Sequence, residues 1–272
     1  MVDSRDSHAH RLIACVIAFL TLAWFGCSRA GRSLQVEEGY FDDAILSDFR
    51  TRTNLTDTMR LQMSVEIATR DEKTEVRQIL AYKRPDKFRL QVLDPMNVTR
   101  VVVVANGDLL RLFYVREYEG IEAPLRDDVL RRLFRMDIRV SDIRTAIVAD
   151  PFIDYAKPPT GIERRDGRTV LTRPSARKSY VDEITIEEFD GQTVVKEWRI
   201  RPESGGDTEQ ITRFTDYREI GGVLRPMEVT IERAKDATRL RFRVSEAEMN
   251  PSLADASFDL SFPPNAKVDR LQ

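Results

Sequence analysis

Cysteine and histidine are the residue types that most restrict the chemistry open to this chain. The 272 residues include two cysteines and two histidines. Cys27 closely follows an uncharged apolar run over residues 12–25. A bilayer-spanning helix needs about 20 apolar residues, so this run is too short to cross and has the length of a signal-peptide core. Cys15 lies inside that run, which leaves Cys27 as the one cysteine of a mature chain, available for lipid attachment and not for an internal disulfide.

Gly26-Cys27 resembles a bacterial lipobox, in which the cysteine thiol is lipidated and becomes the new N-terminus. This predicts a lipoprotein signal peptide over residues 1–26, although the two aromatic residues before Gly26 depart from the usual motif. Two alternatives remain open: ordinary cleavage after Ala30, which would leave a soluble protein, and an uncleaved membrane anchor. Ser28 stands where an aspartate would favour inner-membrane retention. We therefore expect a protein anchored by lipid in the outer membrane and facing the periplasm.

The remaining polar residues give little support for catalysis. His8 and His10 lie in the predicted signal peptide, so the mature chain has no histidine for a Ser-His-Asp or Cys-His system or for a metal site. Glu187-Glu188 and Asp127-Asp128 are paired acids, but neighbouring residues on a strand point to opposite faces. No glycine-rich phosphate loop or metal-ligand spacing is present. We expect no enzymatic activity, no metal and no cofactor.

The overall charge argues against nucleic acid as a partner. The formal net charge is −2 and the sequence pI is about 5.9, whereas binding to phosphates needs a surplus of basic residues. Many arginines alternate with apolar residues in predicted strands. They are interpreted here as the solvated face of a sheet.

An oily loop between two strands is the most unusual local feature. Phe88, Leu90 and Val92 alternate with polar residues, and the β-branched run 99–105 is typical of a central strand. Pro95 prevents ladder pairing in the loop 94–98, whose tip carries Met96 and Val98. These two side chains either fold back onto the sheet edge or project outward to meet a bilayer or an acyl chain.

The rest of the chain predicts one mainly-β domain with a helical insertion. The turn Asn106-Gly107 marks a hairpin. Between Pro124 and Phe152 the period changes to that of helices, one with Leu130, Leu133 and Phe134 and a second over 141–149 with Ser141 as its N-cap. They either cover one sheet face or form a lid. Further strands follow, including 180–188, 193–201 and 238–248, with a turn at Asp166-Gly167.

About ten or eleven antiparallel strands in sequence favour one strongly curved sheet with an apolar concave face. Such a face could hold acyl chains, which gain about 0.8 kcal/mol per buried CH₂, or be an ordinary packed core. In both interpretations the same residues are expected to line the concave face: Phe88, Leu90, Val92, Trp198, Ile200, Leu240 and Phe242.

From about Leu61 to Asn250 the chain resembles the LolA/LolB-type lipoprotein-localisation family. The resemblance depends on the order of three features: the 84–89 entry RPDKFR, the 94–97 loop DPMN before a β-branched strand, and the 221–226 hairpin GGVLRP, followed by Met249-Asn250-Pro251.

The resemblance implies a half-open antiparallel barrel of about 11 strands with helices plugging its concave face. Its cavity would bind the acyl chains of lipids or lipoproteins, received from a periplasmic carrier protein. Met96 stands where the receptor branch has a protruding leucine that helps deliver lipid to the membrane. The expected organisation is residues 1–26 as signal peptide, 27–57 as tether and short helix, and 58–272 as the half-barrel domain. A structural or signalling module on the same fold, binding another envelope protein, remains the alternative.

Overall fold

A computed structural model describes residues 47, 49, 51, 54–134, 136–151, 159–165 and 168–271 of the chain, all within the unit Val36–Gln272. The predicted signal peptide 1–26, Cys27, most of the 27–57 tether, the Asp166-Gly167 turn and the side chain of Phe134 lie outside the described residues. Within the predicted tether, residues 47, 49, 51 and 54 are helical.

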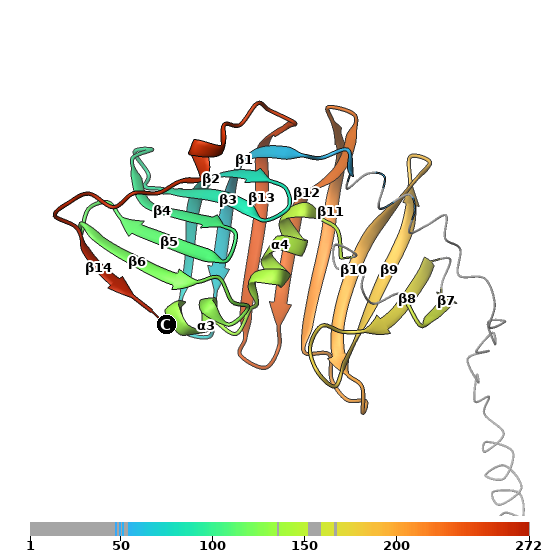
Figure 1. The fold of residues 1–272 in the computed structure, drawn as a ribbon. Helices are drawn as coiled ribbons and strands as arrows, with labels where there is room; N and C mark the ends of the chain where they lie inside the picture. The colour runs from blue at the N-terminus through green and yellow to red at the C-terminus, as the bar shows by residue number, and fades with distance from the viewer. Residues whose placement is uncertain are drawn as a thin grey trace, which may run out of the picture. The chain divides into compact units, whose positions relative to one another are not determined.

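One sheet of 14 strands contains all the described β-structure, in the order β14-β6-β5-β4-β3-β2-β1-β13-β12-β11-β10-β9-β8-β7. Figure 1 shows that it curves around the helices on one side. The first six strands are β1 (Thr58–Ala68), β2 (Lys73–Lys83), β3 (Lys87–Leu93), β4 (Thr99–Asn106), β5 (Leu109–Tyr114) and β6 (Glu119–Pro124). After the helices come β7 (Gly161–Arg165), β8 (Arg168–Pro174), β9 (Tyr180–Phe189), β10 (Gln192–Pro202), β11 (Gln210–Ile220), β12 (Val223–Arg233), β13 (Thr238–Met249) and β14 (Lys267–Arg270).

The predicted curved and open sheet is confirmed, with more strands than the 11 expected. β6 was not predicted because Gly120 and Pro124 interrupt the alternation of apolar and polar residues that marks a strand. β14 was not predicted because it has only four residues. β14 also pairs in parallel with β6, whereas the other paired neighbours in the described sheet are antiparallel.

Both predicted helices are present, as α3 (Val129–Phe134) and α4 (Val140–Val148). The prediction of Ser141 as N-cap is wrong, because α4 is capped by Arg139. The Arg139 amide donates to a carboxylate oxygen of Asp142 at 3.2 Å, and the Ser141 amide donates to Asp127 at 3.1 Å. The carboxylate of Asp142, in the first turn of the helix, therefore accepts a hydrogen bond at the helix start, where the hydroxyl of Ser141 was expected to act.

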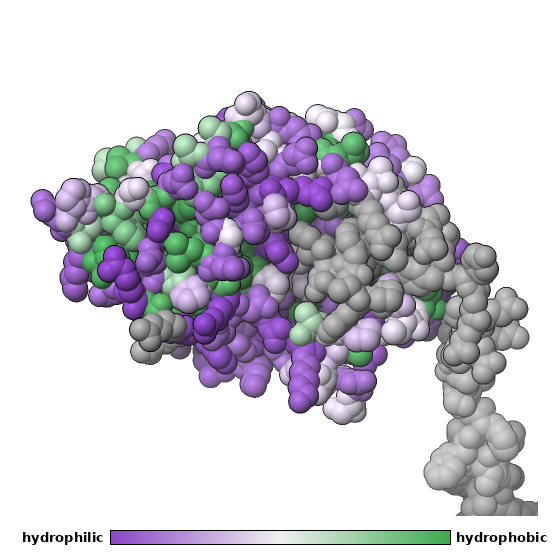
Figure 2. Space-filling view, in the orientation of Figure 1, coloured by the Kyte–Doolittle hydropathy of each residue, from purple (hydrophilic) through white to green (hydrophobic). Residues whose placement is uncertain are grey.

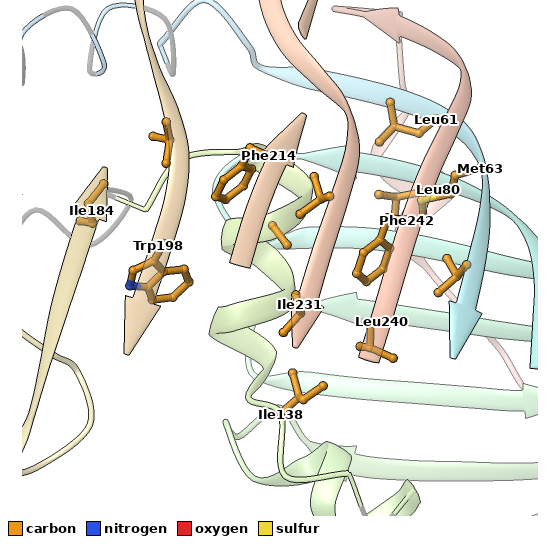
Figure 3. Packing of buried hydrophobic residues seen from close by; sticks show 14 of the residues in the cluster. Leu61, Met63, Leu80, Ile138, Ile184, Trp198, Phe214, Ile231, Leu240 and Phe242 are labelled. Carbon is orange, nitrogen blue, oxygen red and sulfur yellow. The ribbon is translucent and has the colours of Figure 1, made fainter. Parts of the chain in front are cut away.

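Hydrophobic side chains pack on both faces of the sheet. On the concave face, α4 covers a large cluster that includes Leu61, Leu80, Trp198 and Phe242 (Figure 3), and α3 covers a smaller one around Leu110. On the convex face, the segment 255–266, which begins with the 3-10 helix η1 (Asp255–Phe258), covers β4 and β5. The helices and the C-terminal segment thus shield opposite sides of the sheet.

Candidate functional site

An apolar row crosses the concave face from β1 to β6. Directly paired residues in adjacent strands point to the same face, so the registers place one residue from each strand side by side. This row is Leu61, Leu80, Leu90, Val103, Leu112 and Ile121. Five interstrand spacings of about 4.8 Å make it about 24 Å long.

The row is buried at its β1–β2 end, whereas three of its four members on β3–β6 are half-buried and the fourth, Leu112, is buried. Leu61 and Leu80 lie in the cluster under α4, while Leu90, Val103 and Ile121 are half-buried. Alongside it, Val92 and Val101 are a half-buried pair, separated from the 94–98 loop by one further pair, Leu93 with Thr99. In Figure 2 hydrophobic side chains show as green surface on the left, where Figure 1 places β4, β5 and β6. This part of the concave face leaves apolar surface open to a ligand.

The predicted lining residues fall into two groups. Trp198, Ile200, Leu240 and Phe242 are all buried in the cluster that α4 covers (Figure 3). By contrast, Phe88, Leu90 and Val92, all on β3, are half-buried. Phe88 and Leu90 pack against the cluster edge, whereas Val92 lies beyond it. A ligand could therefore reach the β3 group directly, but the first group only if α4 moved.

A network of charged side chains, buried except for Asp137, fastens α4 to the sheet. Arg177 donates to Asp142 of α4 at 2.6 Å and to Glu209 at 2.5 Å. Arg233 donates to Glu209 at 3.1 Å and to Asp137, just before α4, at 2.8 Å. Taking such charges out of water is costly, and the hydrogen-bonded pairing offsets that cost only while every partner is present.

Burial acts on both carboxylates of this network, with different outcomes. It raises the pKa of Asp142 above its ordinary value, against the opposing effect of Arg177 and the Arg139 amide. Burial also acts to raise the pKa of Glu209, but a hydrogen bond from Tyr180 and the charges of Arg177 and Arg233 outweigh it, so that this pKa is lowered. Glu209 is thus the better-stabilised anion of the two.

The loop between β3 and β4 is held in one conformation by Asp94. One carboxylate oxygen accepts the amides of Met96 and Val98, both at 2.9 Å, and the other accepts two hydrogen bonds from Arg100 at 2.9 and 2.6 Å. Asn97 takes the left-handed conformation with φ of 63°. As a result Met96 is 76% exposed and Val98 is 50% exposed. The structure places Met96 in solvent and not against the sheet edge.

Asp94 gives this loop a predictable response to acid. The Val98 amide, aided by Arg100 and the Met96 amide and opposed by slight burial, holds the pKa of Asp94 below its ordinary value. A carboxylate with a lowered folded pKa contributes stability above its unfolded pKa of about 3.9, and loses it as pH falls through the folded value. We expect the Val98 amide resonance to titrate with a midpoint below 3.9 in an NMR pH series. Asp94→Asn should abolish that titration, and a parent midpoint at the ordinary value would contradict the assignment.

Two hollows accompany these features. A cavity of about 50 Å³, lined by Phe49, Met59 and Tyr217 among others, has room for a few water-sized molecules and not for an acyl chain. An open groove of about 320 Å³ lies beside the 94–98 loop and is lined partly by Arg77, Leu93 and Asn97. Across the described ranges, no cluster of three or more His, Cys, Asp or Glu residues is arranged to hold a metal ion.

Several residues of the accessible apolar surface were not predicted from the sequence. Val101 and Val103 were interpreted only as members of a fully buried strand, and Ile121 lies in the strand that was not predicted. The Asn106-Gly107 turn could have identified them. In the structure the two residues that join the strands are Gly107 and Asp108, so Ala105 pairs with Leu110. Counting back by twos from Ala105 places both valines on the same face of the sheet as Ala105, which is the concave one.

The sequence matches no known protein-family model and no curated protein. Its fold matches solved structures. A DUF1329 family protein from Desulfovibrio piger is 12% identical, with a TM-score of 0.60 and coverage of 79% of this chain and 97% of that chain. A putative outer membrane lipoprotein-sorting protein domain from Vibrio parahaemolyticus is 11% identical, with a TM-score of 0.59 and coverage of 80% and 97%.

A LolA superfamily protein from Nitrosomonas europaea is 15% identical, with a TM-score of 0.57 and coverage of 79% and 97%. At such identities the likeness is one of fold, and the fold expected from the LolA/LolB resemblance is confirmed.

In the part of the chain that the structure describes, no helix has the length and apolar character needed to cross a membrane.

Proposed function

We propose that this protein binds the acyl chains of a lipid or lipoprotein on the concave face of its sheet and transfers them to the outer membrane. The observation that carries the proposal is the apolar surface over β3–β6, which stays partly open while the rest of the concave face is packed under helices. The role is one of binding and delivery without a catalytic step.

The dimensions and energetics suit an acyl chain. One leaflet contributes about half of the roughly 30 Å hydrocarbon core, so an extended acyl chain of about 15 Å is close to the roughly 14 Å that the row covers over the three interstrand spacings from β3 to β6. Each CH₂ group removed from water stabilises the complex by about 0.8 kcal/mol. A longer or branched lipid would need the space that α4 now fills, where Trp198 and Phe242 would then become lining residues.

The position of the loop suits delivery. The Val92–Val101 pair lies one residue pair from the 94–98 loop, so the open apolar surface leads toward the exposed side chain of Met96. Lipidation of Cys27 would hold the domain at the outer membrane from the periplasmic side, where a carrier protein could bring the cargo. The fold shared with a lipoprotein-sorting domain and a LolA superfamily protein supports this assignment.

Photocrosslinking of the full chain in membranes with a photoactivatable fatty acid tests the binding surface. We expect crosslinks in peptides from β3 to β6, and their loss in Val101→Asp, which puts a charge on the open apolar surface. Val181→Asp is the matched control, because Val181 is a half-buried valine whose directly paired neighbours place it on the opposite face in β9. A folded protein without crosslinks, or equal crosslinking in both variants, would favour the structural or signalling module instead.

A further inference from the structure

Two turns that lie side by side at one end of the sheet carry most of the exposed large hydrophobic side chains among the described residues. The Val115 amide donates to the Arg100 carbonyl at 2.9 Å, which extends the β4–β5 pairing and brings the 115–118 turn next to the 94–98 loop. Six large hydrophobic residues are exposed among those described, and four lie on these turns: Met96, Val98, Val115 and Tyr118. We call this end the tip.

We propose that the tip docks onto a lipid bilayer that contains anionic headgroups, with the 115–118 turn as a second contact beside Met96. This inference rests on the proposed function, because the open apolar surface of β3–β6 ends at the tip and a lipid cargo must pass between the two. The side chains project from narrow turns, a shape suited to insertion between headgroups.

The 115–118 turn presents its aromatic residue in a fixed position. Tyr118 adopts φ of 59°, and its amide donates to the Tyr114 carbonyl at 3.0 Å. Its ring meets that of Phe113 edge-on, with the centroids 5.7 Å apart, yet remains 44% exposed. Tyrosine prefers the membrane–water interface, where its ring contacts acyl chains and its hydroxyl stays hydrated.

Two arginine side chains, those of Arg116 and Arg77, lie beside the exposed apolar side chains of the tip. Arg116 is exposed between Val115 and Tyr118, and no acidic partner for it lies among the residues that the structure describes. Arg77 bonds the carbonyl oxygens of Asp94 and Pro95 and lines the groove of about 320 Å³ beside the loop. It likewise forms no ion pair with any described carboxylate.

Other charges near the tip are neutralised in pairs. Arg100 bonds Asp94, and Lys267, whose amide donates to the Tyr118 carbonyl, lies 3.3 Å from Glu119. Glu117 is the remaining acid of the turn. The tip therefore carries a positive balance on a chain whose formal net charge is −2. Charge complementarity favours a bilayer with anionic lipid as the occupant.

A fluorescent reporter on the turn tests docking directly. The full chain with Cys15→Ser and Cys27→Ser, labelled with NBD at Val115→Cys, is bound to phosphatidylcholine vesicles with or without phosphatidylglycerol. The matched control carries the label at Asp108→Cys, an exposed site on the β4–β5 turn at the other end of the same strands. The N-terminal apolar segment is present in both chains, so only the local environment of the label differs.

We expect the label at 115 to shift to shorter wavelength and to be quenched by brominated lipid in anionic vesicles, while the label at 108 stays in water. Arg116→Gln should reduce the docking equilibrium about fivefold in anionic vesicles and leave it unchanged in zwitterionic ones, since one basic residue near such a surface contributes about a fivefold gain.

Identical signals from the two labels, or an Arg116→Gln variant that docks on anionic vesicles as well as the parent, would overturn the proposal. A label at 115 that is shielded before vesicles are added would overturn it too, in favour of a protein partner. Fatty-acid crosslinking on β3–β6 with a hydrated label at 115 would reject docking while the proposed lipid binding stands.

Discussion

Met96→Glu is expected to leave the melting temperature unchanged and to slow lipid transfer to liposomes by about tenfold to 100-fold. Met96 is 76% exposed, and substitutions at exposed sites usually change stability by less than about 0.5 kcal/mol. A charged side chain costs about 2.5 to 3.5 kcal/mol at the centre of a bilayer and less near the interface, and each 1.4 kcal/mol is a tenfold change. Circular dichroism and a fluorescence transfer assay measure the two quantities on one sample.

Met96→Leu is the matched control for this experiment. It keeps an apolar side chain of similar volume on the same loop, so both stability and transfer should match the parent. A large loss of stability in Met96→Glu would mean that the side chain packs against the protein. Unchanged transfer in a stable Met96→Glu variant would reject the delivery role of the loop.

Arg177→Met is expected to lower the free energy of unfolding by about 3–5 kcal/mol, because it leaves the buried carboxylate of Asp142 without its cation. The double variant Arg177→Met/Asp142→Leu should recover part of this loss, since it removes the buried charge together with its partner. Urea denaturation followed by circular dichroism gives the three free energies.

An exposed pair serves as the control for the buried one. Arg199 bonds Glu197 with 46% of its side chain accessible, and Arg199→Met should cost no more than about 1 kcal/mol. If the single and double variants at 177 lose the same stability, the uncompensated charge of Asp142 is not the cause. The network would then act mainly through packing.

The alternation of apolar and polar residues predicted most of the sheet, because strand periodicity is local. This alternation predicted that Trp198 and Phe242 lie on the concave face of the sheet, but it did not identify the residues that pack over them. Which residues these are depends on how α4 lies across strands far away in sequence. The same limit explains why β14, a four-residue strand that pairs with β6, was missed.

The interpretation of the arginines as a solvated face was wrong for several of them. Among the arginines of predicted strands, Arg225 and Arg233 are buried, with 5% and 2% exposure. Arg177, in the loop before β9, is also buried, with 6% exposure. The acids that pair with Arg177 and Arg233 are distant in sequence: Asp142 lies 35 residues from Arg177, and Asp137 lies 96 residues from Arg233. No local pattern distinguishes an arginine with such a partner from one that faces water. The network that fastens α4 was therefore beyond sequence reasoning.

The pairing of β1 with β13 has a consequence for how the protein is made. Residues bonded across this seam, such as Arg60 and Glu248, lie 188 positions apart. The β1–β6 and β7–β13 meanders contain local pairings that can form during synthesis, whereas the seam needs nearly the whole chain. Until then two half-sheets with bare apolar faces coexist, a state prone to aggregation. Folding in the cell should therefore depend on chaperones that shield these faces until the seam closes.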